Sequence, residues 1–346
     1  MFEAFAMICA LSGPSDVCRE ALVPGFAAPD RAGCLSALAA GPPAWLVAAK
    51  PAMTDCQPRP GSRLQFDEIA PGVFVHLGAI AEADPDNAGD VANIAFVIGA
   101  DSVTVIDTGG SRQVGEQAYL AVRERSELPI SHVILTHMHP DHVLGAAAFA
   151  DLGAAIVGHA HLPRALADRA DSYLAGFGQR IGPEGFLGTR IVAPGLLVDD
   201  RLSVDLGARQ LRIQRWPTGH SESDMTVFDP QTQTLFAGDL LFDQHAPAID
   251  GSLRGWQGVL ADLTGQPAAR VVPGHGGPVL PWPSGADALL RYLAVLADDT
   301  RAAIDSGAPL GAAAARIGAS EAGNWALFDL FNPRNATLAY TELEWE

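Results

Sequence analysis

The chain has 346 residues and a formal net charge of −18, from 22 basic and 40 acidic side chains. A field of that sign opposes phosphate backbones and anionic lipid headgroups, and no cluster of Lys or Arg offsets it locally, so no nucleic-acid partner is predicted. Hydrophobic residues make up 48% of the chain, enough for a well-filled core, yet no apolar stretch approaches the roughly 20 residues that span a bilayer.

The first 62 residues are predicted to form a small separate module that prolines interrupt repeatedly. All four cysteines lie in it, at Cys9, Cys18, Cys34 and Cys56. The even number and the clustering favour two disulfides, although four cysteines allow three pairings and the sequence does not choose among them. Short helices are expected at residues 17–22 and 31–39, and residues 56–62 are expected to be a linker.

Targeting signals are weak in this segment. Residues 1–11 are apolar, but they contain Glu3, and the first basic residue is Arg19. A secretory signal instead begins with a basic segment and ends at small residues. The clustered cysteines favour a periplasmic or otherwise exported protein, because disulfides persist in oxidising compartments. A cytoplasmic protein is the alternative.

Residues 63–306 alternate between short apolar β-type runs and helical segments. A first series predicts strands at residues 73–77, 94–98, 103–107, 132–136 and 155–158, with helices at 112–127, at 143–152 and after His161. A second series predicts strands at 202–206, 210–216, 225–228, 234–237 and 270–272, with helices at 256–263 and 286–305. Two β-rich series with helices indicate two sheets packed face to face with helices outside. Residues 307–346 are expected to pack on this domain as a C-terminal extension.

The strongest chemical signal is the run of residues 136–142, THMHPDH, directly after an apolar strand-like stretch. It holds four metal-capable side chains: His137, His139, Asp141 and His142. Imidazole nitrogens and carboxylate oxygens are ligands that zinc accepts, and as packing residues each would need its own buried partner. His137 and His139 lie at i and i+2, so they point the same way on an extended segment, whereas Asp141 and His142 begin the next helix. One loop can thus supply ligands to two neighbouring cations.

Further ligands must come from later in the chain, because one loop cannot complete two tetrahedral sites. The candidates are His220, Asp239 and His275, which each follow a strand-like run and a glycine. The preceding glycine permits the tight backbone path that a close approach to a metal needs.

The chain resembles the metallo-β-lactamase superfamily over about residues 107–275. The resemblance is carried by four motifs in a fixed order: H-x-H-x-D-H, a glycine-preceded His, G-D and P-G-H-G. The resemblance implies an α/β fold, a four-layer αββα sandwich, that binds two Zn²⁺ ions. It implies a ligand set of His137, His139 and His220 for the first metal, Asp141, His142 and His275 for the second, and Asp239 as the bridge between both. Asp107 matches the structural aspartate that orients the metal loop.

A narrower likeness is to the quinoprotein relay system zinc metallohydrolases and the related hydrolases of sulfur-oxidation clusters. It is carried by residues 248–256 (AIDGSLRGW), residues 334–337 (RNAT) and the cysteine-bearing start. True β-lactamases usually have Cys or Ser at the bridging position. Asp239 therefore points toward relatives that cleave thioesters, lactones or other esters.

The chemistry that this resemblance implies is dinuclear zinc hydrolysis of a small-molecule substrate, with Asp141 and Asp239 as the catalytic residues. A metal-bridging hydroxide would attack an ester, thioester, lactone or related bond. The candidates for the wall of the substrate pocket lie on the loop after Asp239: His245, Asp250, Ser252 and Arg254. Arg254 is a candidate partner for a substrate carboxylate.

Two other functions are alternatives. A mononuclear iron dioxygenase of persulfides reuses a His/His/Asp set, but it leaves positions open on one metal, which a complete seven-ligand set argues against. The other alternative is an accessory or binding metalloprotein of an exported quinoprotein or sulfur-oxidation system. The oligomeric state is left open.

Overall fold

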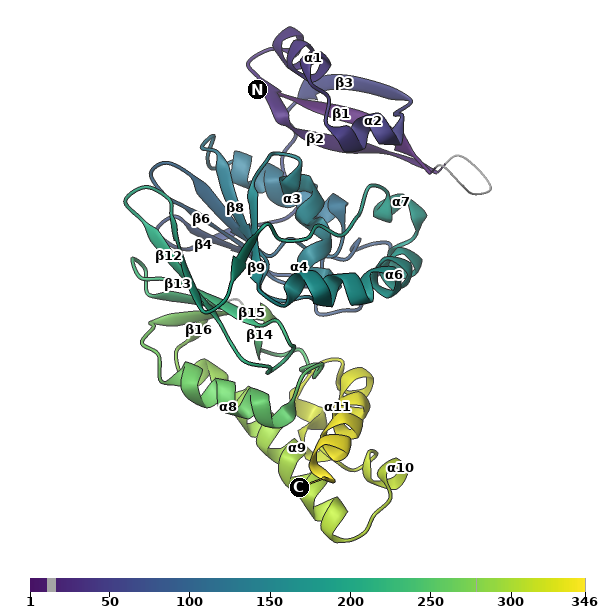
Figure 1. Cartoon of the computed structure of the whole chain (residues 1–346), viewed down its shortest axis with the longest axis vertical. Coiled ribbons are helices and arrows are strands. Elements are labelled where there is room, and N and C mark those ends of the chain that lie inside the picture. Colours follow the sequence, from purple (N-terminus) through teal and green to yellow (C-terminus); the bar gives the residue numbers. More distant parts are fainter. Residues whose placement is uncertain (11–16, 278, 346) are drawn as a thin grey trace.

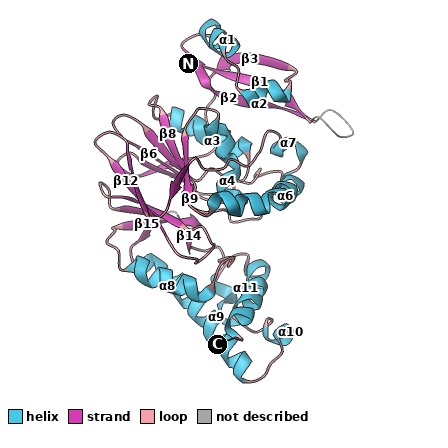
Figure 2. Ribbon diagram, viewed as in Figure 1, coloured by secondary structure: helices cyan, strands magenta, loops and turns pink. Residues whose placement is uncertain are grey.

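The computed structural model describes residues 1–10, 17–277 and 279–345. A small three-stranded sheet lies at one end of the molecule, and two larger sheets with outer helices form the rest (Figures 1 and 2). Both larger sheets pack their inner faces together and carry helices on their outer faces. The predicted four-layer αββα sandwich is therefore confirmed.

The N-terminal sheet has the strand order β2-β1-β3, with antiparallel pairs. Its elements are β1 (Phe2–Cys9), β2 (Cys18–Ala28), α1 (Arg31–Ala40), α2 (Ala44–Ala49) and β3 (Met53–Pro58). One disulfide, Cys9–Cys18, joins β1 to β2, and the other, Cys34–Cys56, joins α1 to β3. The prediction of two disulfides is confirmed, and their pairing is now assigned.

Two local predictions for this segment are wrong. Residues 17–22 were expected to be helical, but from Cys18 onward they belong to β2, which places Cys18 opposite Cys9 and Val23 opposite Ala4. Pairing with β1 outweighs the helix propensity of the Ala and Leu residues in this stretch. The start of the expected linker, Cys56 to Pro58, likewise lies in β3.

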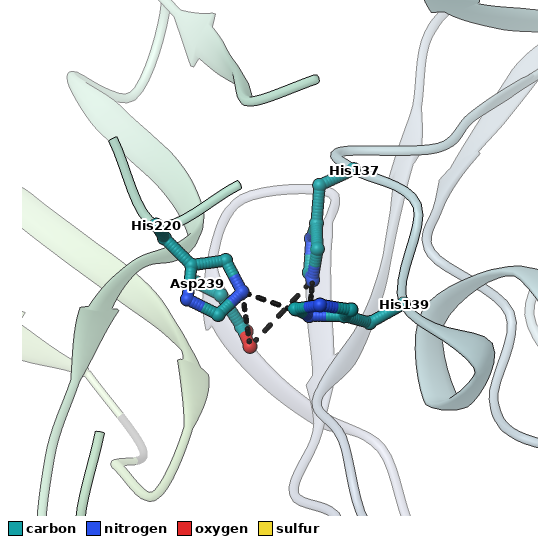
Figure 3. A group of neighbouring side chains, drawn as sticks. All are labelled: His137, His139, His220 and Asp239. Atoms are coloured by element: carbon teal, nitrogen blue, oxygen red, sulfur yellow. Dashed lines mark hydrogen bonds and ion pairs between the residues drawn. The ribbon is translucent and has the colours of Figure 1, made fainter. Parts of the chain in front are cut away.

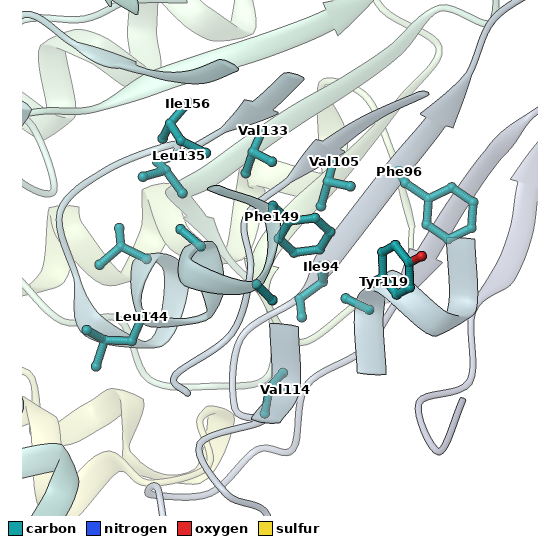
Figure 4. Close-up of a cluster of buried hydrophobic side chains, with 14 of the residues drawn as sticks. Ile94, Phe96, Val105, Val114, Tyr119, Val133, Leu135, Leu144, Phe149 and Ile156 are labelled. Atoms are coloured by element: carbon teal, nitrogen blue, oxygen red, sulfur yellow. The ribbon is translucent and has the colours of Figure 1, made fainter. Parts of the chain in front are cut away.

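The first large sheet has the order β10-β9-β8-β7-β6-β5-β4. Its strands are β4 (Asp67–Ala70), β5 (Val73–His76), β6 (Ile94–Ile98), β7 (Val103–Ile106), β8 (Ile130–Ile134), β9 (Ala155–His159) and β10 (Leu196–Val198). Its outer face is covered by α3 (Arg112–Arg123), α4 (Pro140–Val143), η1 (Leu144–Ala146), α5 (Ala147–Ala150), α6 (Leu162–Ile181) and α7 (Pro183–Phe186). Figure 4 shows the core between them, including Phe96, Tyr119 and Phe149.

The second large sheet has the order β11-β12-β13-β14-β15-β16. Its strands are β11 (Arg201–Asp205), β12 (Gln210–Arg215), β13 (Met225–Asp229), β14 (Thr234–Phe242), β15 (Arg270–His275) and β16 (Leu280–Pro281). The helical elements that follow β14 are α8 (Leu253–Thr264), η2 (Ser284–Ala286), α9 (Asp287–Asp305), α10 (Leu310–Ala313), η3 (Ala319–Asn324) and α11 (Phe328–Leu343). Trp256 and Tyr292 are fully buried in the core beneath them.

The parallel strands direct the sequence motifs to one edge of the sandwich. β7 and β8 are parallel neighbours in one sheet, and β14 and β15 are parallel neighbours in the other. The segment after β8 carries four predicted metal ligands, the loop between β12 and β13 carries His220, and β14 and β15 themselves carry Asp239 and His275. The two sheets therefore bring the predicted ligands together. Among the residues that the structure describes, no helix has both the length and the apolar character needed to cross a bilayer.

Candidate metal centre

The loop after β8 is held in place by Asp107, which follows β7 with φ of +58°. Asp107 Oδ1 accepts a hydrogen bond from the Thr136 backbone nitrogen at 2.8 Å. Its Oδ2 accepts from Thr136 Oγ1 at 2.8 Å and from His142 Nδ1 at 2.9 Å. A left-handed backbone is uncommon for a residue other than glycine, and these three buried hydrogen bonds maintain it. Asp107 thereby fixes both the start of the metal loop and the ring of His142.

Three histidines form a first group, in which one ring nitrogen of each points to a common centre (Figure 3). His139 Nδ1 lies 3.1 Å from His137 Nε2 and 2.9 Å from His220 Nε2. Asp239 Oδ2 completes the group at 3.6 Å from His137 Nε2 and 3.4 Å from His220 Nε2. Donors of a tetrahedral zinc site lie about 3.3 Å apart when each bond is about 2.0 Å, so these spacings match one cation.

A second group lies directly beside the first and consists of Asp141, His142 and His275. His275 Nε2 lies 3.4 Å from His142 Nε2 and 3.3 Å from Asp141 Oδ2. Asp239 reaches this group as well, because its Oδ2 is 3.3 Å from His275 Nε2 and its Oδ1 is 3.1 Å from His142 Nε2. The carboxylate of Asp239 therefore stands between the two groups.

The five histidines use their outer nitrogens to donate to oxygen atoms of the protein. The acceptors are Thr136 Oγ1 for His137, Asp250 Oδ2 for His139, Asp107 Oδ2 for His142, the Ala248 carbonyl for His220 and the Val91 carbonyl for His275. The hydrogen-bond network thus assigns a proton to each outer nitrogen and leaves each inner nitrogen available for a cation.

The electrostatics of the site favour cations in both groups. Burial lowers the pKa of His220 to about 3 and holds the pKa of His137 well below its ordinary value, so neutral imidazoles face one another in the first group. Burial also acts to lower the pKa values of His142 and His275, but the carboxylates of Asp239 and Asp141 raise them, to about 9 for His275. The second group is therefore stabilised by positive charge. A metal ion can supply this charge in place of protons on His142 and His275.

The bridging carboxylate is also the least satisfied group at the centre. Asp239 is 4% exposed, and its Oδ1 accepts no hydrogen bond from any residue that the structure describes. Gly274 leaves room for it, since a Cβ atom there would lie 1.9 Å from Oδ1. A buried carboxylate oxygen without a donor needs a cation, so the residues present fit a pair of divalent metal ions.

A cavity of about 420 Å³ opens over the metal centre. Of the four predicted wall residues, His245 and Asp250 line it. The structure places the other two outside it. Ser252 is the N-cap of α8, where its Oγ accepts from the Gly255 nitrogen, and Arg254 lies on the exposed first turn of that helix. Their closeness to Asp250 in the sequence was misleading. Ser252 and Arg254 lie at the start of α8, and this helix leads away from the cavity.

The sequence interpretation missed the walls that come from α6 and α11. Arg169, Tyr173 and Arg180 line the cavity from α6, and Phe331 and Arg334 line it from α11. A signal for the second wall was present, because residues 332–335 read NPRN inside a helix. Asn and Pro are poor residues for a helix interior, so their presence there calls for a specific role.

Replacing Asp107 with asparagine is expected to weaken the affinity of the group that contains His142 for a metal ion by about 10- to 100-fold. The amide nitrogen of Asn cannot accept the bonds that Asp107 accepts from Thr136 and His142, so the His142 ring loses its orientation. Titration of the metal-free variant with zinc measures the effect. The matched control is Asp101→Asn, in the exposed turn between β6 and β7; equal affinities in both variants would contradict the assigned role.

The comparisons with known proteins agree with this site. The family model of the metallo-beta-lactamase superfamily matches residues 88–275, more than half of the 346-residue chain. The chain belongs to this superfamily, as its motifs predicted, and the predicted hydrolase class agrees with that membership. The narrower likeness to quinoprotein-associated hydrolases stays a prediction.

Two curated relatives carry the name acyl-coenzyme A thioesterase MBLAC2. The human protein is 32% identical over 187 residues, and the protein from Bos taurus is 30% identical over the same length. Each match covers 49% of this chain and 62% of the relative, so the chain spans less than two thirds of the length of these proteins.

Solved structures share the fold at lower sequence identity. A metallo-beta-lactamase from Pontibacter korlensis aligns with a TM-score of 0.55 at 20% identity, over 67% of this chain and 99% of its own. The sec-alkylsulfatase Pisa1 from Pseudomonas sp. aligns with a TM-score of 0.62 at 18% identity, over 81% of this chain and 50% of its own. At these identities the likeness establishes the fold alone.

Proposed function

We propose that this protein is a dinuclear zinc hydrolase. The ligands would be His137, His139 and His220 for one ion, Asp141, His142 and His275 for the other, and Asp239 for both. The observation that carries the proposal is the position of Asp239, whose carboxylate lies within 3.6 Å of inner nitrogens from both groups. One shared carboxylate between two donor sets is the arrangement that a pair of neighbouring metal ions requires.

The substrate class that we propose is a small-molecule acyl thioester, with other esters and lactones as weaker substrates. The relatives that match at 30% and 32% identity are named acyl-coenzyme A thioesterases. A cavity of about 420 Å³ with apolar side chains such as Val91, Phe177 and Ile249 suits an acyl group.

Two zinc ions bound here would supply hydroxide at neutral pH and polarise the acyl oxygen. The protein side chains around them position the substrate. Tyr173 lines the cavity, and burial raises the pKa of its hydroxyl, so it remains a neutral hydrogen-bond donor toward an acyl or leaving-group oxygen. Phe242 stacks on His275 with ring centroids 5.1 Å apart, which keeps water from that side of the ligand. Asp250 orients His139 through a 3.1 Å hydrogen bond.

The proposal is tested with purified protein loaded with zinc. We expect two zinc ions per chain by elemental analysis, and faster hydrolysis of acyl thioesters than of lactones, aryl esters or a chromogenic β-lactam. Chelation should abolish the activity, and zinc should restore it. One iron per chain together with oxygen consumption on a persulfide would replace the proposal with the dioxygenase alternative. Bound metal without any hydrolysis would favour an accessory metalloprotein.

We also propose that the protein works in an oxidising compartment, such as the periplasm. The support is the pair of disulfides in the N-terminal module. Alkylation of free thiols in freshly lysed source cells should leave all four cysteines unmodified until a reductant is added. Full labelling before reduction would instead indicate a reducing compartment.

A further inference from the structure

One of the arginines that line the cavity above the metal centre has no carboxylate partner among the described residues. Of its three arginines, Arg169 lies 3.1 Å from Glu222 and 3.6 Å from Asp250, and Arg180 lies 3.8 Å from Glu82. Arg334 also lines the cavity, yet its guanidinium pairs with no carboxylate in the part of the chain that the structure describes. Arg334 is exposed, so its guanidinium is accessible to a ligand that enters the cavity.

The backbone that carries Arg334 is rigidly held on both sides. Asn335 is buried, its Oδ1 accepts from the Ile249 nitrogen at 3.0 Å, and its Nδ2 donates to the Pro247 carbonyl at 2.6 Å. Asn332 is buried as well, donates to the Ile317 carbonyl at 2.9 Å and accepts from the Tyr292 hydroxyl at 2.9 Å. These bonds tie α11 to the loop of residues 246–250, which also carries the partner of His139. The helix backbone at Arg334 is therefore held in place beside the metal centre, while the arginine itself is exposed.

An arginine whose guanidinium is not engaged by a carboxylate can recognise an oxyanion, because the planar guanidinium matches carboxylate and phosphate oxygens with two parallel hydrogen bonds. On α11, the apolar side chains of Leu330 and Phe331 line the same opening beside Arg334 and Asn335. The cavity thus combines a metal centre for the scissile bond, apolar side chains and the cation of Arg334.

We propose that Arg334 binds an oxyanion of the substrate, so that the site selects acyl thioesters that carry a carboxylate or phosphate away from the scissile carbonyl. This inference rests on the proposed hydrolase function and specifies its substrate class. A carboxylate would belong to the acyl group, and a phosphate would belong to the thiol. Arg334 is a binding residue in either case, so its removal should raise KM more than it lowers kcat.

The test uses the zinc-loaded full chain and two matched pairs of thioesters. The first pair is succinyl against butyryl thioester of one neutral thiol, which differ in a terminal carboxylate. The second pair is butyryl 4′-phosphopantetheine against butyryl pantetheine, which differ in the phosphate. For Arg334→Gln we expect kcat/KM to fall about 10- to 100-fold for the anionic member of at least one pair, and less than about 2-fold for both neutral members.

Two further variants separate recognition from general damage. Arg334→Lys keeps the charge but not the planar fork, so it should retain part of the preference for the anionic substrate. Arg164→Gln, on α6 with an 88% exposed side chain, removes the same charge outside the cavity and should leave both pairs unchanged. Loss confined to one pair identifies the oxyanion.

Equal losses, or no loss, for charged and neutral substrates in Arg334→Gln would overturn the inference while leaving the hydrolase proposal intact. If the wild-type protein cleaves none of the four thioesters and no other ester, the hydrolase proposal itself fails. The two failures are therefore distinguishable in one set of measurements.

Discussion

Replacing Asp239 with alanine is expected to lower kcat/KM for the preferred thioester by about 10³-fold or more. The variant should also bind fewer than two metal ions per chain. Asp239 is the one side chain whose oxygens lie within 3.6 Å of inner nitrogens in both histidine groups. Without it, Asp141 is the one carboxylate left in the two groups, and it contacts the second group alone, so the paired cations would lose the group that neutralises both. Elemental analysis and steady-state kinetics measure the two effects.

The matched control for this substitution is Asp262→Ala, at an exposed position of α8. It removes one carboxylate from a helix that covers the same sheet and should leave metal content and activity unchanged. Circular dichroism establishes that both variants are folded. An Asp239→Ala protein that keeps two zinc ions and the wild-type rate would refute the bridging role.

The candidate ligands of the centre could be predicted from sequence because their immediate neighbours form recognisable local patterns. His137 and His139 share a direction through their i, i+2 spacing after β8, and Asp239 and His275 each follow a glycine. The structure explains that pattern for Gly274, where any side chain would collide with Asp239 Oδ1. Candidate ligands that depend on local backbone geometry can be recognised from neighbouring residues in the sequence. In this structure they lie together at the edge where the parallel strands of both sheets end.

The substrate wall was not predictable in the same way. Arg334 reaches the cavity through contacts of Asn335 with residues 247 and 249, almost 90 positions earlier in the chain. Ser252 and Arg254 are only a few residues from Asp250, yet the start of α8 directs them elsewhere. Neighbouring residues line the same wall of a cavity only where the chain keeps its direction. At Ser252, the N-cap of α8, the chain changes direction, so the residues that follow Asp250 leave the cavity wall.

The N-terminal module shows a third case, in which local preference and long-range pairing disagree. The stretch predicted as a helix, residues 17–22, contains good helix formers such as Glu20, Ala21 and Leu22, but pairing with β1 and the Cys9–Cys18 disulfide hold it in an extended strand from Cys18 onward. That strand brings Arg19 to the outer face of the hydrolase domain, where it lies 2.8 Å from Glu116 of α3. The interface between the module and the catalytic domain is therefore built on buried charge.

Replacing Arg112 with methionine should lower the free energy of unfolding by about 3–5 kcal/mol. Arg112 is fully buried on α3 and lies 2.9 Å from Glu116 and 2.6 Å from Asp151. It also faces the N-terminal module, because its guanidinium stacks on the Trp45 ring at 3.9 Å and donates to the Leu22 carbonyl. Methionine fills much of the volume but leaves each of two buried carboxylates with one arginine instead of two, since Glu116 keeps Arg19 and Asp151 keeps Arg190. Chemical denaturation measures the loss, and limited proteolysis should show earlier cleavage within residues 1–62.

A second substitution separates the charge effect from the loss of packing. In the double variant Arg112→Met/Glu116→Gln, the loss of stability should differ from the sum of the two single losses, because Arg112 and Glu116 lie 2.9 Å apart and share one buried network with Arg19. Arg164→Met, in an exposed pair with Asp168, is the surface control and should change stability by less than about 0.5 kcal/mol. If Arg112→Met is as mild as Arg164→Met, the buried charges do not anchor the module, and its attachment must depend on apolar contacts such as Phe5 and Leu22 in the core against α3.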